Sequence, residues 1–164
     1  MTIRFGILTI SDRSARGERT DSSGPALAAL IQAQGWSITR QIILPDEESA
    51  IRSGLVEWAD GGDCDVILTT GGTGFASRDV TPEATRAVIE RETPGLAEAM
   101  RLESFKKTPH AMLSRAVAGI RRRALIVNLP GSPKGAVENL YTILPVLPHA
   151  VQLLKDDPSA ESSH

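Results

Sequence analysis

Hydrophobic and polar positions along this chain follow two spacings, one typical of strands and one typical of helices. Short apolar runs rich in β-branched residues predict strands at 3–10, 36–44, 65–70 and 124–129. The first run is almost wholly apolar, which is typical of a strand buried on both faces. Longer runs with helical spacing predict helices at about 23–34, 47–60, 81–92, 96–105, 109–115 and 136–144. This alternation predicts an α/β fold with a mostly parallel central sheet.

Local signals at the ends of these segments support the assignment. Gly35 and Gly61-Gly62 are typical helix stops. Thr81 followed by Pro82 is typical of a helix N-cap and first helical position. Three of the predicted helices therefore have a defined beginning or end.

The chain of 164 residues shows no internal repeat, linker or low-complexity block. Its length suits one domain with a sizeable core, which we expect to span residues 1–155. Residues 156–164 are polar and lack periodicity, so we expect a disordered tail there.

Composition and charge exclude several classes of protein. Eighteen basic and twenty acidic side chains give a net charge of −2, and aromatic residues make up 4%, so no nucleic-acid or membrane partner is indicated. Cys64 is the only cysteine, which excludes an internal disulfide and a cysteine-based zinc cluster. No secretory signal or membrane span is evident, so we expect a cytoplasmic protein.

The stretch 65–83 concentrates the candidate chemistry. A strand runs into Gly71, Gly72, Thr73 and Gly74, and a helix begins a few residues later. Glycines adopt positive φ easily, so successive N–H groups can turn inward and bind a phosphate, helped by the positive end of a nearby helix. This stretch predicts an anion-binding turn.

Two aspartates are expected near that turn. Asp46 follows the second strand and Asp79 follows the glycines. Ligands of open α/β sheets bind beyond the carboxyl ends of the strands, where these segments and the turns at 11–23 and 129–132 meet. Because Mg²⁺ prefers carboxylate and phosphate oxygens, Asp46 and Asp79 are candidate ligands of a metal–nucleotide complex. Structural alternatives remain, since Asp46 could cap the following helix and Asp79 could be an ordinary turn residue.

Other catalytic motifs fit poorly. No lysine follows the glycines, so a P-loop is disfavoured. Residues 72–77 fall one glycine short of a dinucleotide fingerprint, which leaves a nicotinamide oxidoreductase as a third-ranked alternative. The three histidines lack metal-ligand spacing, and no nucleophile elbow is present.

Six groups of residues carry a family resemblance. They are 11–13, 21–25, Pro45-Asp46, 69–85, 113–115 and 128–133. Together they closely resemble the signature of the molybdenum cofactor biosynthesis family that includes MogA, MoaB and the G domains of gephyrin and its plant relatives. The segment Arg78-Asp79-Val80-Thr81-Pro82-Glu83 resembles the MogA and gephyrin type more than the MoaB type.

The resemblance implies a three-layer α/β/α sandwich, commonly trimeric, that binds molybdopterin and adenylylates it with Mg-ATP. It also implies that Asp46 and Asp79 are the catalytic acids and magnesium ligands. The substrate-binding residues that we expect are Ser11, Asp12, Gly71, Gly72, Thr73, Gly74, Ser114, Pro130, Gly131 and Ser132. A downstream molybdenum-insertion protein is a possible partner.

The mechanism expected from this resemblance is a nucleotidyl transfer. The phosphate of molybdopterin attacks the α-phosphate of ATP, and pyrophosphate leaves. Such transfers depend on positioning and on stabilisation of developing charge. The main alternative is a MoaB-like protein that binds or carries the pterin without nucleotide turnover.

Overall fold

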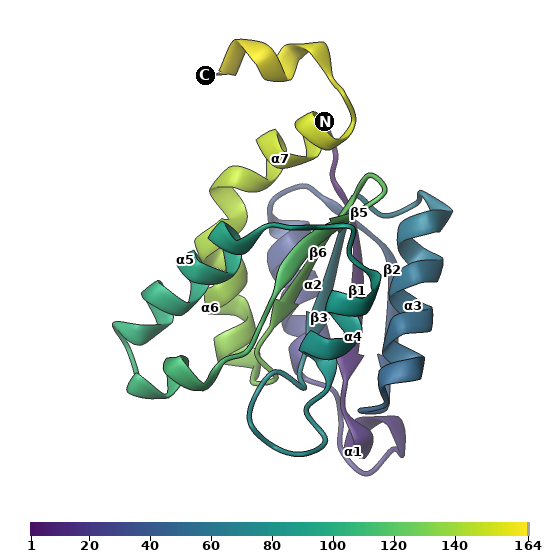
Figure 1. Ribbon diagram of the computed structural model, residues 1–164, viewed down its shortest axis with the longest axis vertical. Coiled ribbons are helices and arrows are strands. Elements are labelled where there is room, and N and C mark those ends of the chain that lie inside the picture. Colours follow the sequence, from purple (N-terminus) through teal and green to yellow (C-terminus); the bar gives the residue numbers. More distant parts are fainter. Residues whose placement is uncertain (164) are drawn as a thin grey trace.

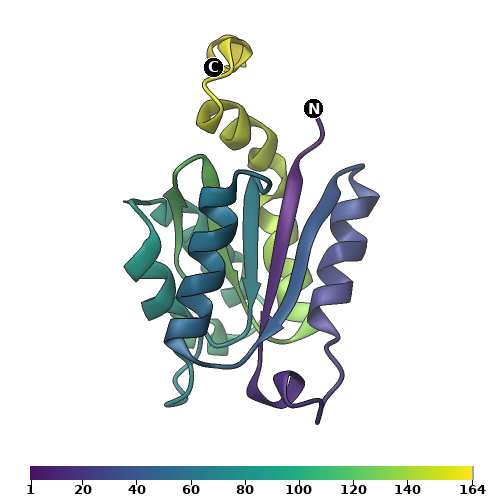
Figure 2. The ribbon, with the colours of Figure 1, turned by 90° about the vertical axis from the view of Figure 1, so that its right-hand side faces the viewer.

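The computed structural model describes residues 1–163 and places a six-stranded sheet between two layers of helices (Figures 1 and 2). The strands are β1 (Arg4–Ile10), β2 (Ser37–Leu44), β3 (Val66–Thr70), β4 (Arg91–Glu92), β5 (Ala118–Arg121) and β6 (Ala124–Leu129). The helices are α1 (Asp12–Ala15), α2 (Ser23–Ala33), α3 (Glu48–Gly61), α4 (Thr81–Val88), α5 (Pro94–Phe105), α6 (Pro133–Ile143) and α7 (Leu147–Leu154). The 3₁₀ helices are η1 (Pro109–Leu113), η2 (Leu144–Val146) and η3 (Pro158–Ser163).

The sheet has the order β2-β1-β3-β6-β5-β4. Strands β2, β1, β3 and β6 are parallel, whereas β5 is antiparallel to β6 and β4 is antiparallel to β5. The predicted α/β fold with a mostly parallel sheet is therefore confirmed.

Each face of the sheet has its own apolar core. Alternate residues of β1 point to opposite faces, as the pleat of a strand requires. Ile7 belongs to the core that includes residues of α2, α5, α6 and α7, and Leu8 belongs to the core that includes residues of α3 and α4. Both side chains are fully buried, which confirms the prediction of a strand covered on both faces.

Helix ends agree with the sequence signals at two positions and differ at a third. Gly35 and Gly62 follow α2 and α3 with φ of 78° and 76°, as expected of helix stops. Helix α4 begins at Thr81 itself, after Val80, and the Thr81 hydroxyl donates to the Gly71 carbonyl oxygen at 2.9 Å instead of capping the helix. The assignment of Thr81 as N-cap was therefore wrong, because this hydroxyl holds the glycine turn.

Two short strands were not predicted. Helix α4 ends at Val88 rather than near residue 92, because Arg91–Glu92 pair with β5 as β4. Strand β5 has only four residues and pairs with β6 across a tight turn in which Arg122 has a φ of 55°. Strands this short carry little hydrophobic periodicity, and their pairing with neighbouring strands decides their structure.

The C-terminal residues follow α7 at the end of the molecule opposite to α1 (Figure 1). Pro158–Ser163 form η3, in which Ala160 is buried. Disorder of residues 156–164 in solution stays a prediction, and its last residue, His164, lies outside the described residues. No helix within residues 1–163 is long and apolar enough to cross a membrane.

Candidate active site

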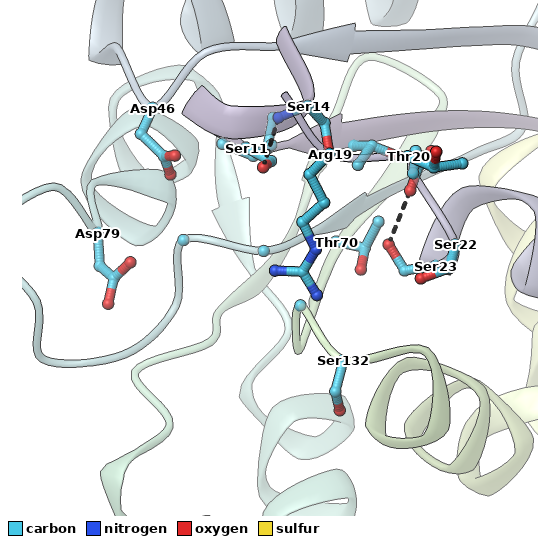
Figure 3. Close-up of a pocket in the computed structure, with 16 residues that line it drawn as sticks. Ser11, Ser14, Arg19, Thr20, Ser22, Ser23, Asp46, Thr70, Asp79 and Ser132 are labelled. Carbon is cyan, nitrogen blue, oxygen red and sulfur yellow. Dashed lines mark hydrogen bonds between the residues drawn. The ribbon is translucent and has the colours of Figure 1, made fainter. Parts of the chain in front are cut away.

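The carboxyl ends of the four parallel strands meet at one edge of the sheet. Ile10 is in register with Leu44, and Thr70 is in register with Thr9 and Leu129. The turns that follow these strands therefore converge. They enclose a cavity of about 420 Å³ (Figure 3).

Both predicted acids line this cavity. Figure 3 shows the carboxylates of Asp46 and Asp79 beside each other at one side of it. Ser11, Gly71, Gly72, Gly131 and Ser132 line the same cavity. The expected meeting of residues from four strand ends is therefore present in the structure.

The glycine turn has a backbone that only glycine fits. Gly71 has a φ of 105°, and a Cβ there would lie 2.3 Å from the Ile10 carbonyl oxygen. Gly72 has a φ of 70°, and a Cβ there would lie 2.3 Å from Thr81 Oγ1 and 3.1 Å from Asp46 Oδ1. Neither position has room for a side chain, and both strongly favour glycine.

Asp12 does not line this cavity but positions Asp46, which does. The Asp12 N–H donates to Asp46 Oδ2, and the Asp46 N–H donates to Asp12 Oδ1, both at 2.9 Å. Arg78 donates from Nε and Nη2 to the two Asp12 oxygens, each at 2.9 Å. The Arg78 guanidinium lowers the pKa of Asp12, which therefore stays charged while it holds the turn after β2.

Asp46 is in the opposite electrostatic situation. Burial raises its pKa, and the negative charges of Asp12 and Asp79 add to the rise, against the hydrogen bond from the Asp12 N–H. No group of three or more acidic, histidine or cysteine side chains among residues 1–163 is arranged as a complete metal site. Two carboxylates on one cavity, neither of them in an ion pair within the described part of the chain, still fit a magnesium ion that shares its ligands with substrate phosphates.

Removal of the Asp46 charge is expected to stabilise the metal-free protein. The pKa of Asp46 is higher in the folded protein than in the unfolded chain, so the charged carboxylate lowers the free energy of unfolding at neutral pH. This destabilisation disappears as pH falls through the raised pKa and the carboxylate takes up a proton. Asp46→Asn should therefore raise Tm at pH 7, with a gain that shrinks on acidification.

A buried aspartate elsewhere provides the control in that melting experiment. Burial alone would raise the pKa of Asp65, but hydrogen bonds from Arg4 and Lys155 outweigh it and lower the pKa. Asp65→Asn should therefore lower Tm at pH 7. A lower Tm for Asp46→Asn as well would contradict the electrostatic account of Asp46.

Arg115 holds the loop that carries Asp79. Its Nε donates to the Gly74 carbonyl oxygen at 2.8 Å, and its Nη2 donates to the Asp79 carbonyl oxygen at 2.7 Å. Its Nη1 forms an ion pair with Glu83 at the start of α4. One planar guanidinium therefore fixes both ends of the segment 74–79 and the helix after it.

Arg115→Lys keeps the charge but removes the fixed geometry of these three contacts. We expect the rate of the reaction catalysed at this site to fall about 100-fold, because displacement of a reacting group by about 1 Å slows a reaction by about that factor. Arg86→Lys is the control, since Arg86 on the same helix as Glu83 makes an exposed ion pair with Glu92. Equal activity of the two variants would contradict the role of Arg115.

A second cavity of about 340 Å³ lies on the other side of the glycine turn. Four predicted residues, Thr73, Gly74, Ser114 and Pro130, line this cavity instead of the first. Ser132 lines both cavities, so they are neighbours. The predicted substrate residues thus divide into two groups around one shared turn.

Several cavity residues were not singled out individually. Arg19, Thr20 and Asp21 line the first cavity, and the loop 11–23 that carries them was expected at this edge of the sheet. The second cavity is lined by further polar side chains, among them Arg101, Ser104, His110, Glu138 and Asn139. Glu138 and Asn139 lie on α6, three and four residues beyond Gly135. Because α6 directly follows the predicted turn at 129–132, these two residues could have been predicted as its neighbours.

A mostly parallel sheet whose strand ends carry a glycine turn and two acids defines an α/β protein with a polar cavity at the edge where such folds bind their ligands. Comparison with known proteins identifies the family within this class. Residues 6–149 match the family model described as "probable molybdopterin binding domain". The chain therefore belongs to this family, and the predicted family is confirmed.

Curated relatives carry names from the same pathway. The chain is 50% identical over 160 residues to the molybdenum cofactor synthesis protein cinnamon of Drosophila melanogaster, covering 96% of this chain but 26% of the relative. It is 42% identical over 155 residues to a molybdopterin adenylyltransferase of Helicobacter pylori, covering 93% of this chain and 88% of the relative. The chain thus spans about a quarter of the first relative and most of the second.

Solved structures share the fold. The molybdopterin biosynthesis enzyme MoaB of Thermus thermophilus superposes with a TM-score of 0.90 at 52% identity, covering 96% of this chain and 99% of that one. A MogA structure superposes with a TM-score of 0.86 at 39% identity, covering 92% and 99% of the two chains. These structures confirm the predicted fold class.

Proposed function

We propose that this chain is a molybdopterin adenylyltransferase, which transfers AMP from ATP to the molybdopterin phosphate and releases pyrophosphate. The observation that carries the proposal is the presence of Asp46, Asp79 and the Gly71-Gly72 turn on one cavity. The relatives named molybdopterin adenylyltransferase, most of whose length the chain covers, support it.

The two neighbouring cavities suit the two substrates. We assign the phosphates of ATP to the cavity with the two aspartates, and the pterin to the second cavity. Asn139 donates its amide group to Ser104 and to the Gly135 carbonyl oxygen, which leaves Asn139 Oδ1, the Ser104 hydroxyl hydrogen and the Glu138 carboxylate to pair with the edge of a pterin ring. The shared Ser132 then lies where the two substrates meet.

Asp46 and Asp79 are the residues of this chain that would hold magnesium. When bound, that ion would neutralise charge on the phosphates of ATP. Because the Gly71 N–H donates to the Leu129 carbonyl oxygen at 3.1 Å, phosphate binding by the glycine turn falls to the N–H groups from Gly72 onward. Arg115 keeps Asp79 and Gly74 in place. The protein then orients the pterin phosphate toward the α-phosphorus of ATP.

We also infer a homotrimer. Leu102, Phe105, Met112 and Tyr141 are each half or more exposed, and they lie on α5, η1 and α6. Helix α5 contacts both η1 and α6, so these side chains lie on connected elements. Light scattering in solution should give three times the 17.5 kDa mass of one chain. A cytoplasmic location and delivery to a molybdenum-insertion protein stay predictions.

The alternative is a pterin carrier without nucleotide turnover. The solved structure named MoaB, 52% identical to this chain, supports the carrier as the second candidate function. Pyrophosphate release distinguishes the two functions, measured after the protein is mixed with molybdopterin, Mg²⁺ and ATP. An adenylyltransferase releases pyrophosphate only when all components are present, whereas a carrier binds molybdopterin and releases none.

A further inference from the structure

Arg19 is a cation inside the first cavity that the sequence did not single out. It lies in the loop between α1 and α2, and its side chain points into the cavity in the direction of Ser132 (Figure 3). No hydrogen bond or ion pair joins the Arg19 guanidinium to any of residues 1–163. The five N–H donors of this side chain are thus not engaged by the described part of the chain.

The backbone around Arg19 is anchored, which places its exposed side chain at this cavity. Two residues later, Asp21 accepts hydrogen bonds from Thr9 Oγ1 on β1 at 2.8 Å and from the Gly24 N–H at 3.1 Å. On the other side, the Glu18 N–H donates to the Arg13 carbonyl oxygen at 2.9 Å. The loop therefore presents Arg19 from a fixed base next to the central strand.

Arg19 is also the one cationic side chain among the described residues that line this cavity. Asp21, Asp46 and Asp79 line the same space, and carboxylates alone repel a polyphosphate. Arg16 and Arg40 are paired with carboxylates, and Arg13, which has no side-chain partner among residues 1–163, lines neither cavity. An unpaired arginine in this cavity is therefore available to an anionic ligand.

We propose that Arg19 binds the polyphosphate of ATP and stabilises the charge that develops on pyrophosphate as it leaves. This inference rests on the proposed function. An oxygen of the pterin phosphate forms a bond to the α-phosphorus, and the bond from the α-phosphorus to the bridging α–β oxygen breaks. The pyrophosphate leaves with the electron pair of that bond, next to the guanidinium. Arginine suits this role because its planar donors contact two phosphate oxygens at once.

The test measures ligand binding together with turnover in Arg19→Gln, Arg19→Lys and the control Arg13→Gln. Arg13 lies on the adjacent α1, lines neither of the two cavities described above, and loses the same charge in its variant. We expect Arg19→Gln to weaken calorimetric binding of Mg-ATP about 10- to 100-fold, the size of a lost charge-assisted contact. Inhibition by pyrophosphate should weaken likewise. Arg19→Lys should recover part of this loss, and Arg13→Gln and molybdopterin binding should be nearly unchanged.

The outcomes separate this inference from the proposed function. Normal Mg-ATP binding by Arg19→Gln, with active wild-type protein, would overturn the inference and leave the adenylyltransferase in place. Weakened Mg-ATP binding by Arg19→Gln, in a protein whose wild type forms no product, would support the polyphosphate contact and overturn both the proposed function and the leaving-group role of Arg19. A loss of molybdopterin binding with intact ATP binding would assign Arg19 to the other substrate and overturn the inference. Wild-type protein that binds no Mg-ATP would overturn both.

Discussion

Asp79→Asn is expected to lower the rate of adenylyl-molybdopterin formation by about 10²- to 10³-fold, the size of effect seen when one preorganised electrostatic group is removed. Asparagine keeps the shape of the side chain and can still accept the hydrogen bond from the Ala76 N–H. The fold and molybdopterin binding should therefore persist. The measurement is turnover at saturating substrates, together with the Kd for molybdopterin.

Asp156→Asn is the matched control for that variant. Asp156 comes two residues after the end of α7, which lies at the end of the molecule opposite to α1 (Figure 1), and its ion pair with Arg123 is exposed. Asparagine also tolerates its positive φ of 53°. Full activity of Asp79→Asn would remove the catalytic role assigned to Asp79, and a large loss in Asp156→Asn would show that the assay reports general damage.

Gly71→Ala is expected to destabilise the protein and to abolish most of its activity. The added Cβ would lie 2.3 Å from the Ile10 carbonyl oxygen, and this backbone atom of β1 cannot rotate away. Residues other than glycine are also strained at a φ of 105°. We expect a loss of at least about 2 kcal/mol, which corresponds to a fall in Tm of roughly 4–8 °C.

Two other glycines separate the causes of this effect. Gly17 has a positive φ of 73° but no atom within 4 Å of an added Cβ, so Gly17→Ala should show backbone strain alone, about 1–2 kcal/mol. Gly95, in the first turn of α5, has neither a positive φ nor a close neighbour, so its alanine variant should be neutral or slightly stabilising. Equal melting temperatures for Gly71→Ala and Gly95→Ala would contradict the account of the glycine turn.

The meeting of Asp46 and Asp79 could be predicted from the sequence because the topology of a parallel sheet decides it. Once β2 and β3 are recognised as parallel strands, their carboxyl ends must lie at the same edge. The glycine turn was predictable for a similar reason, since its residue types restrict the local backbone. Hydrophobic spacing and turn residues carry both pieces of information.

The contacts that position these groups could not be predicted in this way. Arg115 reaches the carbonyl oxygens of Gly74 and Asp79 from a segment 36 and more residues away. Asn128 is buried and donates to Thr69 and Thr85, joining β6 to β3 and α4 beneath the turn. Such bonds depend on the packed positions of separate elements, which no local pattern encodes.

Arg19 belongs to the same group of unpredictable features. In the sequence it follows Arg13 and Arg16 in one polar stretch, and nothing distinguishes it from those two neighbours. The bond between Asp21 and Thr9 ties the loop to β1 and so brings Arg19 to the cavity. Only the folded chain shows which arginine enters the cavity.

The most direct test of the central claim follows two labels of ATP separately. Wild-type protein is incubated with molybdopterin and Mg²⁺, and with ATP labelled at either the α- or the γ-phosphate. The adenylyltransferase account predicts that the α-label moves to the molybdopterin product and that the γ-label appears in pyrophosphate, in equal amounts and only when molybdopterin is present. Binding of molybdopterin without transfer of the α-label would contradict the account.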